Sequence, residues 1–325
     1  MPIERIPLGN DRDAWLAARL GFINASEMPT VCGEAHFGSL AELFAEKKGL
    51  RPARIDTGVL RRGRWGEASV FEALADERPE WRIVRAKVHV RDTTRRIACT
   101  PDGFAEAPGR DGFGVVQTKV IARSIFRQRW LDDPSAGFDG AATPPVPYRI
   151  QTVTEEMLNE TAWGLLAVLI CGEFDWQLRL FDIERDPVIE DRILYCADQF
   201  WRNHLDANIM PPFEPQRDEA LVKALYPRDN GIAIDLKKDN RALALVDDLA
   251  HTSAALKRLK DQESAIKTEL SAKLGDATFG VLADGRCLSW RTQHRKPYSV
   301  AAMDYRVLRV LKSAPNKKDS VDDDE

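Results

Sequence analysis

An amide and an amine stand on alternate positions of an otherwise apolar segment, VVQTK, which contains Gln117 and Lys119. Residues two apart on a strand point to the same side, so the two side chains should share one face, opposite Thr118. The segment TPDGF places a carboxylate, Asp102, fifteen residues earlier. Mg²⁺ prefers hard oxygen ligands, and a lysine beside an attacking water can orient or deprotonate it. The pattern therefore predicts a site for metal-dependent phosphodiester hydrolysis.

The same segments also have a purely structural interpretation. VVQTK alone is typical of an amphipathic strand end with solvated Gln and Lys side chains, and Asp102-Gly103 alone is typical of a turn. The order of the two motifs, one after an alternating strand and the other within a strand, favours the metal site more than either motif does separately.

The elements that must position these residues follow from hydrophobic periodicity. Residues 11–50 are predicted to form helical segments broken at GFINAS, with Ser26 as a helix N-cap. The segments WRIVRAKVHVRD and RRIACTPDGF alternate like two strands, and GFGVVQTKV is a third. Further strands are expected at GLLAVLI and DWQLRLFDI, and further helices at about 56–75, 147–160 and 186–205. This order predicts an α/β domain with a mixed sheet.

The pattern changes near residue 220, so we predict a first domain over 1–220 and an accessory region over 221–325. Apolar residues recur at three- and four-residue steps along a charged helix: Leu243, Val246, Leu249, Leu256, Leu259, Ile266, Leu270 and Leu274. GVLADGRCLSW should form a hairpin behind this helix. An amphipathic helix packed on its own domain is the commonest explanation; oligomerisation, partner docking and DNA contact are alternatives.

Composition gives no global indication of nucleic-acid binding, because the net charge of the 325 residues is −4. A local basic segment, KKGLRPARIDTGVLRRGR at 47–64, and an acidic tail, DSVDDDE, are the exceptions. The basic segment fits either a solvated face or a channel for the DNA backbone, and the tail is typical of a solubility element. Five scattered cysteines favour a reducing compartment, and no apolar run is long enough for a membrane helix. We therefore expect a cytoplasmic protein.

Five separated motifs, in order, resemble those of the phage lambda exonuclease / YqaJ-like viral recombinase family of the PD-(D/E)XK nuclease superfamily. They are RLGFINASE, RRGRWGEASVFEAL with Gly63 and Glu67, TPDGF, VVQTK and PYRIQTVTEEM, and they cover roughly residues 10–215. The resemblance implies a restriction-endonuclease-like α/β core, with a mixed central sheet flanked by helices and a helix-rich C-terminal extension.

Carried over by position, the resemblance implies that Asp102 ligates two metal ions. Gln117, through its side-chain oxygen, and the Thr118 carbonyl would complete one site, and Glu67 would support the second. Lys119 would activate the water. A later glutamine, Gln151, would orient a metal ligand or the scissile phosphate. Structural alternatives stay open: Glu67 could form a solvated ion pair, and Gln151 could cap and pack its helix.

The resemblance also implies contacts to DNA. Arg19 and Ser26 would bind the terminal 5′-phosphate, a combination of guanidinium and hydroxyl that suits an anion on chemical grounds as well. Arg61 and Arg64 would contact the DNA backbone. A surface arginine and a simple N-cap are the alternatives for Arg19 and Ser26.

We therefore expect a Mg²⁺-dependent 5′–3′ exodeoxyribonuclease, with Mn²⁺ as a possible substitute, that acts on double-stranded DNA ends and leaves 3′ overhangs. The resemblance further implies a homotrimer, a single-strand annealing protein as partner and a phage or prophage origin in a bacterial host. Family members often have a carboxylate where Gln117 stands, so magnesium affinity should be reduced. A structure-specific or restriction-like endonuclease and a catalytically weak DNA-end-binding protein remain alternatives.

Overall fold

The computed structural model describes residues 3–9, 12–35, 38–51, 58–135, 140–297, 299, 302 and 304–311. Two compact units divide the chain, Met1–Leu225 and Tyr226–Glu325. The predicted boundary between residues 220 and 221 falls inside α8 (Glu219–Leu225), whose Leu221 is buried against Ala41 and Ala45 of the first unit. Burial of this leucine is the physical reason that α8 stays with the first unit.

A five-stranded mixed sheet forms the centre of the first unit. Its strands lie in the order β3 (Arg82–Arg85), β6 (Gly103–Glu106), β7 (Phe113–Ala122), β8 (Trp163–Cys171) and β9 (Trp176–Glu184). The β7–β8 pair is parallel and the other pairs are antiparallel. Eight consecutive residues of β8 are buried, which explains its unbroken apolar sequence: the strand is covered on both faces.

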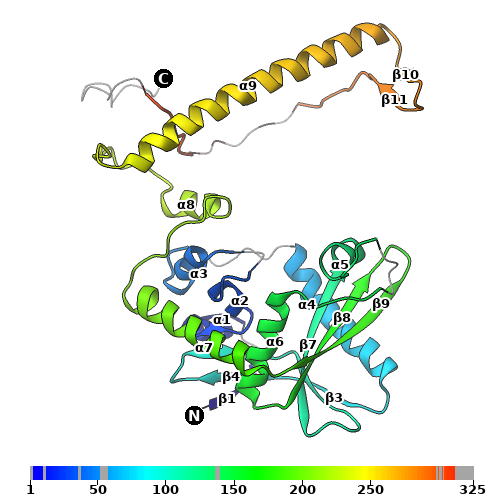
Figure 1. The fold of residues 1–325 in the computed structure, drawn as a ribbon, viewed down its shortest axis with the longest axis vertical. Helices are drawn as coiled ribbons and strands as arrows, with labels where there is room; N and C mark the ends of the chain where they lie inside the picture. Colours follow the sequence, from blue (N-terminus) through cyan, green and yellow to red (C-terminus); the bar gives the residue numbers. More distant parts are fainter. Residues whose placement is uncertain are drawn as a thin grey trace. The chain divides into compact units, whose positions relative to one another are not determined.

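Helices α4 (Gly58–Glu77) and α6 (Val146–Asn159) cover opposite faces of this sheet (Figure 1). Alternate residues of β8 separate into two hydrophobic clusters, as the two-residue period of a strand requires. The cluster under α4 contains Val70, Leu74, Leu165, Ala167 and Leu169. The cluster under α6 contains Ile150, Val153, Leu166, Val168 and Ile170, and α7 (Pro187–Phe200) also contributes to it.

A second, four-stranded sheet has the order β1 (Ile3–Pro7), β4 (Val88–Asp92), β5 (Ile97–Cys99) and β2 (Ile23–Asn24). The segments WRIVRAKVHVRD and RRIACTPDGF were each predicted to form one strand. Both predictions are wrong, because each segment is divided between the two sheets. Pro101 interrupts the second segment because proline donates no ladder hydrogen bond. The first segment divides after Ala86: the Ala86 N–H still donates to the Asp102 carbonyl in the β3–β6 register, whereas the Lys87 carbonyl already accepts from Leu8, next to β1. Around this sheet lie α1 (Arg12–Leu20), α2 (Met28–Val31) and α3 (Leu40–Lys47).

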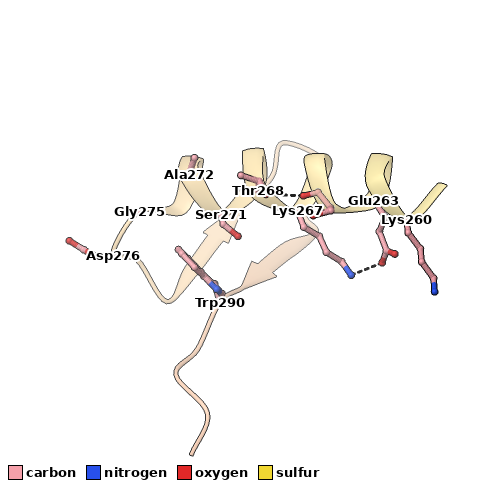
Figure 2. A pocket seen from close by; sticks show the side chains of 10 residues that line it. Lys260, Glu263, Lys267, Thr268, Ser271, Ala272, Gly275, Asp276 and Trp290 are labelled. Carbon is pink, nitrogen blue, oxygen red and sulfur yellow. Dashed lines mark hydrogen bonds and ion pairs between the residues drawn. The ribbon is translucent and has the colours of Figure 1, made fainter. Parts of the chain in front are cut away.

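The second unit contains α9 (Asn240–Leu274) and a hairpin of β10 (Phe279–Val281) and β11 (Cys287–Ser289), as predicted. Asp239 caps α9, since its carboxylate accepts from the amides of Arg241 and Ala242. No residue of α9 is buried, and Leu243, Leu256 and Ile266 of its apolar stripe are exposed, so the role of this helix stays a prediction. Figure 2 shows an open groove between α9 and Trp290, lined in part by the Glu263–Lys267 ion pair.

The predicted fold class is confirmed: a mixed sheet lies between helices and a helical C-terminal region follows. Across the described ranges, no helix is both long enough and apolar enough to cross a membrane. Two shorter helices, α5 (Arg123–Arg129) and the π-helical turn η1 (Trp201–Asp206), complete the first unit.

Candidate active site

Asp102 stands directly before β6, at the point where the sheet opens. The ladder between β6 and β7 ends at the pair Gly103–Val116, although β7 continues to Ala122. The Thr118 N–H therefore lies beyond the last paired residue of β6, and it donates to Asp102 Oδ2 at 2.8 Å. The carboxylate thus takes the place of the next ladder acceptor and lies beside the β7 backbone.

Three donors converge on this one carboxylate oxygen. Besides the Thr118 N–H, Asp102 Oδ2 accepts from Gln117 Nε2 at 2.5 Å and from Thr118 Oγ1 at 2.7 Å. The sequence predicted the Thr118 side chain on the opposite face from Gln117. Because Asp102 lies beside the strand, both side chains reach it. The carboxylate is consequently held in a single position.

A chain of hydrogen bonds leads from Asp102 into α6. Gln151 Nε2 donates to Gln117 Oε1 at 2.8 Å and to Glu155 Oε1 at 3.0 Å. Gln151 and Glu155 are four residues apart, so they share one face of the helix. The structure thereby brings together three of the predicted site residues from three separate motifs, and it adds Glu155, which the sequence analysis did not single out.

Glu67 reaches the same region from the other face of the sheet. Helix α4 approaches β7 closely at Gly66, where a Cβ atom would lie 2.7 Å from a methyl carbon of Val120. The resemblance drew attention to Gly63, but that residue has open space around it. Burial and the charge of Asp102 raise the pKa of Glu67, while its 2.6 Å ion pair with Arg85 and the charge of Lys119 lower it. Glu67 therefore lies within electrostatic range of Asp102, and Arg85 is its ion-pair partner.

Lys119 shares the Gln117 face of β7, as predicted. Its Nζ lies 5.6 Å from the centre of the Tyr148 ring on α6. Burial raises the pKa of Tyr148, so the phenol is neutral and the ring serves as an aromatic surface for the ammonium group. The charge of Lys119 acts on both Glu67 and Glu155, which places the ammonium group within electrostatic range of both carboxyl groups.

The donor set suits a hard cation only in part as it now stands. Among the described residues, no three His, Cys, Asp or Glu side chains group together as metal ligands. The alternative set consists of carboxylate, amide and carbonyl oxygens. Gln117 Nε2 lies 2.5 Å from Asp102 Oδ2 and 3.3 Å from the Thr118 carbonyl oxygen. A half-turn of the amide would put Oε1 there instead and would create a three-oxygen environment suited to Mg²⁺ or Mn²⁺.

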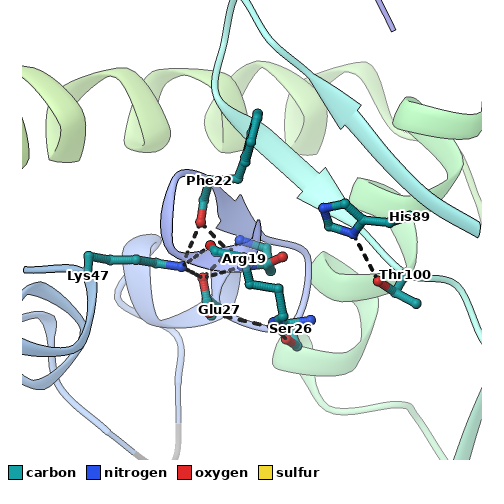
Figure 3. A network of polar contacts seen from close by, with 8 residues as sticks. Arg19, Phe22, Ser26, Glu27, Lys47, His89 and Thr100 are labelled. Carbon is teal, nitrogen blue, oxygen red and sulfur yellow. Dashed lines mark hydrogen bonds and ion pairs between the residues drawn. The ribbon is translucent and has the colours of Figure 1, made fainter. Parts of the chain in front are cut away.

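Arg19 and Ser26 also come together, in a second cluster (Figure 3). Arg19 Nη2 donates to Ser26 Oγ at 3.1 Å and lies 3.6 Å from Glu27 Oε1. Lys47 contacts Glu27 more closely, at 2.7 Å. Because 3.6 Å exceeds hydrogen-bonding distance, the guanidinium group can still form a charge-assisted pair with an incoming anion.

The prediction that Ser26 caps a helix is wrong. Helix α2 has only four residues, its N-cap is Glu27 without a side-chain cap bond, and Pro29 removes one of its first amides. The Ser26 hydroxyl instead accepts from Arg19. Any anion bound here would meet the guanidinium and the hydroxyl rather than the amides of a helix N-terminus.

The described residues of the basic segment at 47–64 differ in exposure and in their partners. The Lys47 side chain is 2% exposed, and burial lowers its pKa although Glu27 opposes this effect. Arg51 pairs with Glu42 at 2.9 Å. On α4, Arg61, Arg62 and Arg64 are exposed. Arg54 and the acidic tail lie outside the described residues. Among the described residues of the segment, those that can contact a phosphate backbone lie in the first turns of α4.

His89 and Thr100 were not predicted as site residues. His89 Nδ1 lies 3.1 Å from Thr100 Oγ1, and Figure 3 shows this pair. Burial and the charges of Arg19 and Arg91 lower the pKa of His89, so the imidazole is neutral. An isolated histidine in an alternating strand gives no sequence signal for such a position, and only the pairing of β4 with β5 brings it there.

No protein-family model and no curated protein matches this chain. Among solved structures, an alkaline exonuclease from Laribacter hongkongensis has 18% sequence identity and a TM-score of 0.45, over 61% of this chain and 94% of that chain. The chain is similar to exonucleases. A phage related exonuclease from Haemophilus somnus 129PT has 10% identity and a TM-score of 0.40, over 57% of this chain and 96% of that chain. Neither similarity is close enough to assign an activity, which must come from the site itself.

Proposed function

We propose that this protein is a metal-dependent deoxyribonuclease that degrades the 5′-phosphorylated strand of linear double-stranded DNA. The observation that supports this most directly is the Asp102 carboxylate, fixed beside β7 by Gln117 and Thr118. Lys119 stands on the same strand, and its charge acts on a second carboxyl group, Glu67. Two carboxylates with a nearby ammonium group form a set that suits metal-assisted phosphodiester hydrolysis.

Mg²⁺, or Mn²⁺ in its place, would be held by Asp102, Gln117 and the Thr118 carbonyl, with Glu67 supporting a second ion. When bound, the metal would neutralise charge on the scissile phosphate and lower the pKa of water. The chain's own residues have the other roles. Lys119 would orient the attacking water and stabilise charge on the phosphate. Tyr148 would limit the movement of the Lys119 side chain, and Gln151 would hold the Gln117 amide.

End recognition would belong to the Arg19–Ser26 pair, and the exposed arginines Arg61 and Arg64 would contact the DNA backbone. Hydrolysis from a 5′-phosphorylated terminus would release mononucleotides and leave a 3′ overhang. A single-strand annealing protein that receives this overhang, and a trimeric assembly around the duplex, are part of the proposal through the motif resemblance.

The test uses linear duplex DNA that is 5′-phosphorylated on one strand, with Mg²⁺ or Mn²⁺. We expect wild type to degrade that strand, and Asp102→Ala and Lys119→Ala to lose at least about 100-fold in rate, the size typical of losing a group in general acid–base catalysis. Lys223→Ala is the matched control, because Lys223 pairs with Glu219 on the exposed surface. Persistence of the substrate with wild type under both metals would contradict the proposal.

A protein that binds DNA ends without cutting them is the second candidate. It is favoured by one observation: Gln117 presents its amide nitrogen, rather than its oxygen, to Asp102. Retention of end-labelled duplex without degradation in either metal would support this candidate. Cleavage of closed circular plasmid would instead indicate an endonuclease of the same fold.

A further inference from the structure

Glu155 is a buried carboxyl group to which the proposed mechanism gives no role. It lies on α6 with 1% of its surface exposed, and its Oε2 has no hydrogen-bond partner among the described residues. Its Oε1 accepts from Gln151 Nε2 at 3.0 Å, so it stands at the inner end of the chain that leads through Gln117 to Asp102. A change at Glu155 can therefore reach the proposed metal site through two amide groups.

The surroundings of Glu155 favour its neutral form. Burial first, and then the charges of Asp102 and Glu156, raise the pKa of Glu155 well above its ordinary value, while the Gln151 hydrogen bond and the charge of Lys119 oppose this. An ionised carboxylate with one oxygen lacking a partner would carry a large desolvation cost. A neutral carboxyl group, by contrast, can offer either a carbonyl oxygen or a hydroxyl to Gln151.

The direction of the chain decides which atom of Gln117 faces Asp102. At present each amide donates through nitrogen, Gln151 to Gln117 and Gln117 to Asp102. For Gln117 to present oxygen to a cation, its nitrogen must turn toward Gln151. Gln151 must then turn its own oxygen toward Gln117, which brings that oxygen against Glu155. This arrangement needs a hydrogen-bond donor at position 155, which Glu155 supplies through the hydroxyl of its neutral form; a carboxylate there would repel the Gln151 oxygen.

We propose that Glu155 is a positioning residue of the metal site: as a neutral acid it can donate to Gln151, which lets Gln117 turn its amide oxygen toward a cation beside Asp102. The inference rests on the proposed function, because it assumes a divalent metal at Asp102. It assigns Glu155 no contact with the metal or with DNA. The reversal of both amides accompanies metal binding.

The experiment is difference infrared spectroscopy of the full-length protein with and without saturating Mn²⁺, with binding followed by calorimetry. The C=O stretch of a protonated carboxyl group is distinct from carboxylate bands. We expect Mn²⁺ to move the band of Glu155 to higher frequency, because its carbonyl loses the Gln151 hydrogen bond. Glu155→Gln should remove the moving band and keep the Mn²⁺ affinity within about threefold, well below the 10–100-fold typical of losing an outer-shell partner, since a carboxamide also both donates and accepts.

Two variants make the test specific. Glu156→Gln is the matched control, because Glu156 is an adjacent buried carboxyl group. Its oxygens have no hydrogen-bond partner among the described residues, and it takes no part in the hydrogen bonds that connect Glu155 to Asp102. It should leave the moving band in place. Gln151→Leu interrupts the chain and should abolish the response of the Glu155 band to Mn²⁺, which a merely structural acid would not do. It should also weaken Mn²⁺ binding about 10- to 100-fold.

Three results would overturn the inference. They are a Glu155 band that does not move at saturating Mn²⁺, a band that still moves in Gln151→Leu, and a loss of about tenfold or more in Mn²⁺ affinity for Glu155→Gln. If the wild-type protein binds Mn²⁺ and degrades DNA, any of these three results would leave the proposed function intact. A wild-type protein that neither binds Mn²⁺ nor degrades DNA would overturn both.

Discussion

Replacing Gln117 by glutamate tests the contact on which the site depends. Gln117 Nε2 donates to Asp102 Oδ2 at 2.5 Å, and Gln117 is 3% exposed. Gln117→Glu would exchange an attractive hydrogen bond for two like charges. At about 4 Å between charge centres and an effective dielectric constant near 20, their repulsion is about 4 kcal/mol. Relaxation and partial solvation should reduce this, so we expect the metal-free variant to be about 2 kcal/mol less stable at pH 8.

The assay is thermal unfolding in EDTA and in Mn²⁺. For a unit of about 225 residues the deficit corresponds to a melting temperature lowered by about 4–8 °C. Mn²⁺ should raise the melting temperature of Gln117→Glu more than that of wild type, because a cation turns the repulsion into ligation by two carboxylates. Nuclease activity at low Mg²⁺ should not fall.

The sign of the pH dependence follows from the same repulsion. The introduced carboxyl would have a raised pKa in the folded state, so its stability contribution is full at low pH and is lost as pH rises. The deficit should therefore shrink as pH is lowered from 8 toward 5. Gln177→Glu is the control, since Gln177 Nε2 lies 3.4 Å from Asp175 Oδ2 in an exposed contact. This substitution should change the free energy of unfolding by less than about 0.5 kcal/mol. A variant as stable as wild type in EDTA would refute the assigned Gln117–Asp102 contact.

Further predictions concern the close helix contact, a buried acid and end recognition. Gly66→Ala should lower the free energy of unfolding by about 1–3 kcal/mol in urea titrations, because its Cβ would overlap a β7 side chain, whereas Gly63→Ala should be neutral or stabilising by up to about 1 kcal/mol. Burial raises the pKa of Glu156 to about 8, so its contribution to stability is lost as pH rises from 4.5 to about 8. In urea titrations across this range, the free energy of unfolding should decline less for Glu156→Gln than for wild type. Parallel curves for the two proteins would contradict the assignment. Arg19→Ala should reduce the ratio of degradation rates for 5′-phosphorylated over 5′-hydroxyl duplex about 10- to 100-fold. Arg202→Ala, which removes an exposed ion pair, should leave this ratio unchanged. An unchanged ratio for Arg19→Ala would show that Arg19 does not bind the 5′-phosphate.

Much of the candidate site follows from short-range sequence order. Asp102 and Gln117 flank a hairpin formed by neighbouring strands, so their spacing alone places them opposite each other at its open end. The alternation in VVQTK correctly placed Lys119 and Gln117 on one face. The helix that contains Gln151 was also predictable from its periodicity, because an amphipathic pattern needs no information from distant residues.

Other features depend on partners far along the chain. Lys47 reads as part of a basic surface, but Glu27 and the carbonyl oxygens of Arg19 and Phe22 surround its ammonium group. Serine is a preferred N-cap residue, yet the Ser26 hydroxyl accepts a hydrogen bond from Arg19. Neither outcome can be derived from local propensity, because a polar side chain adopts whichever partner the packed structure offers.

The sequence by itself determined that Asp102 and Gln117 belong to neighbouring strand segments, that Gln117 and Lys119 share one face, and that the fold is of the mixed α/β class. Only the tertiary structure decided that Glu67 lies within electrostatic range of Asp102, because α4 approaches β7 closely at Gly66. It also decided that the amide of Gln117 is connected through Gln151 to Glu155. Burial is a property of the packed molecule, and burial gives this last carboxyl group the neutral form on which its proposed role depends.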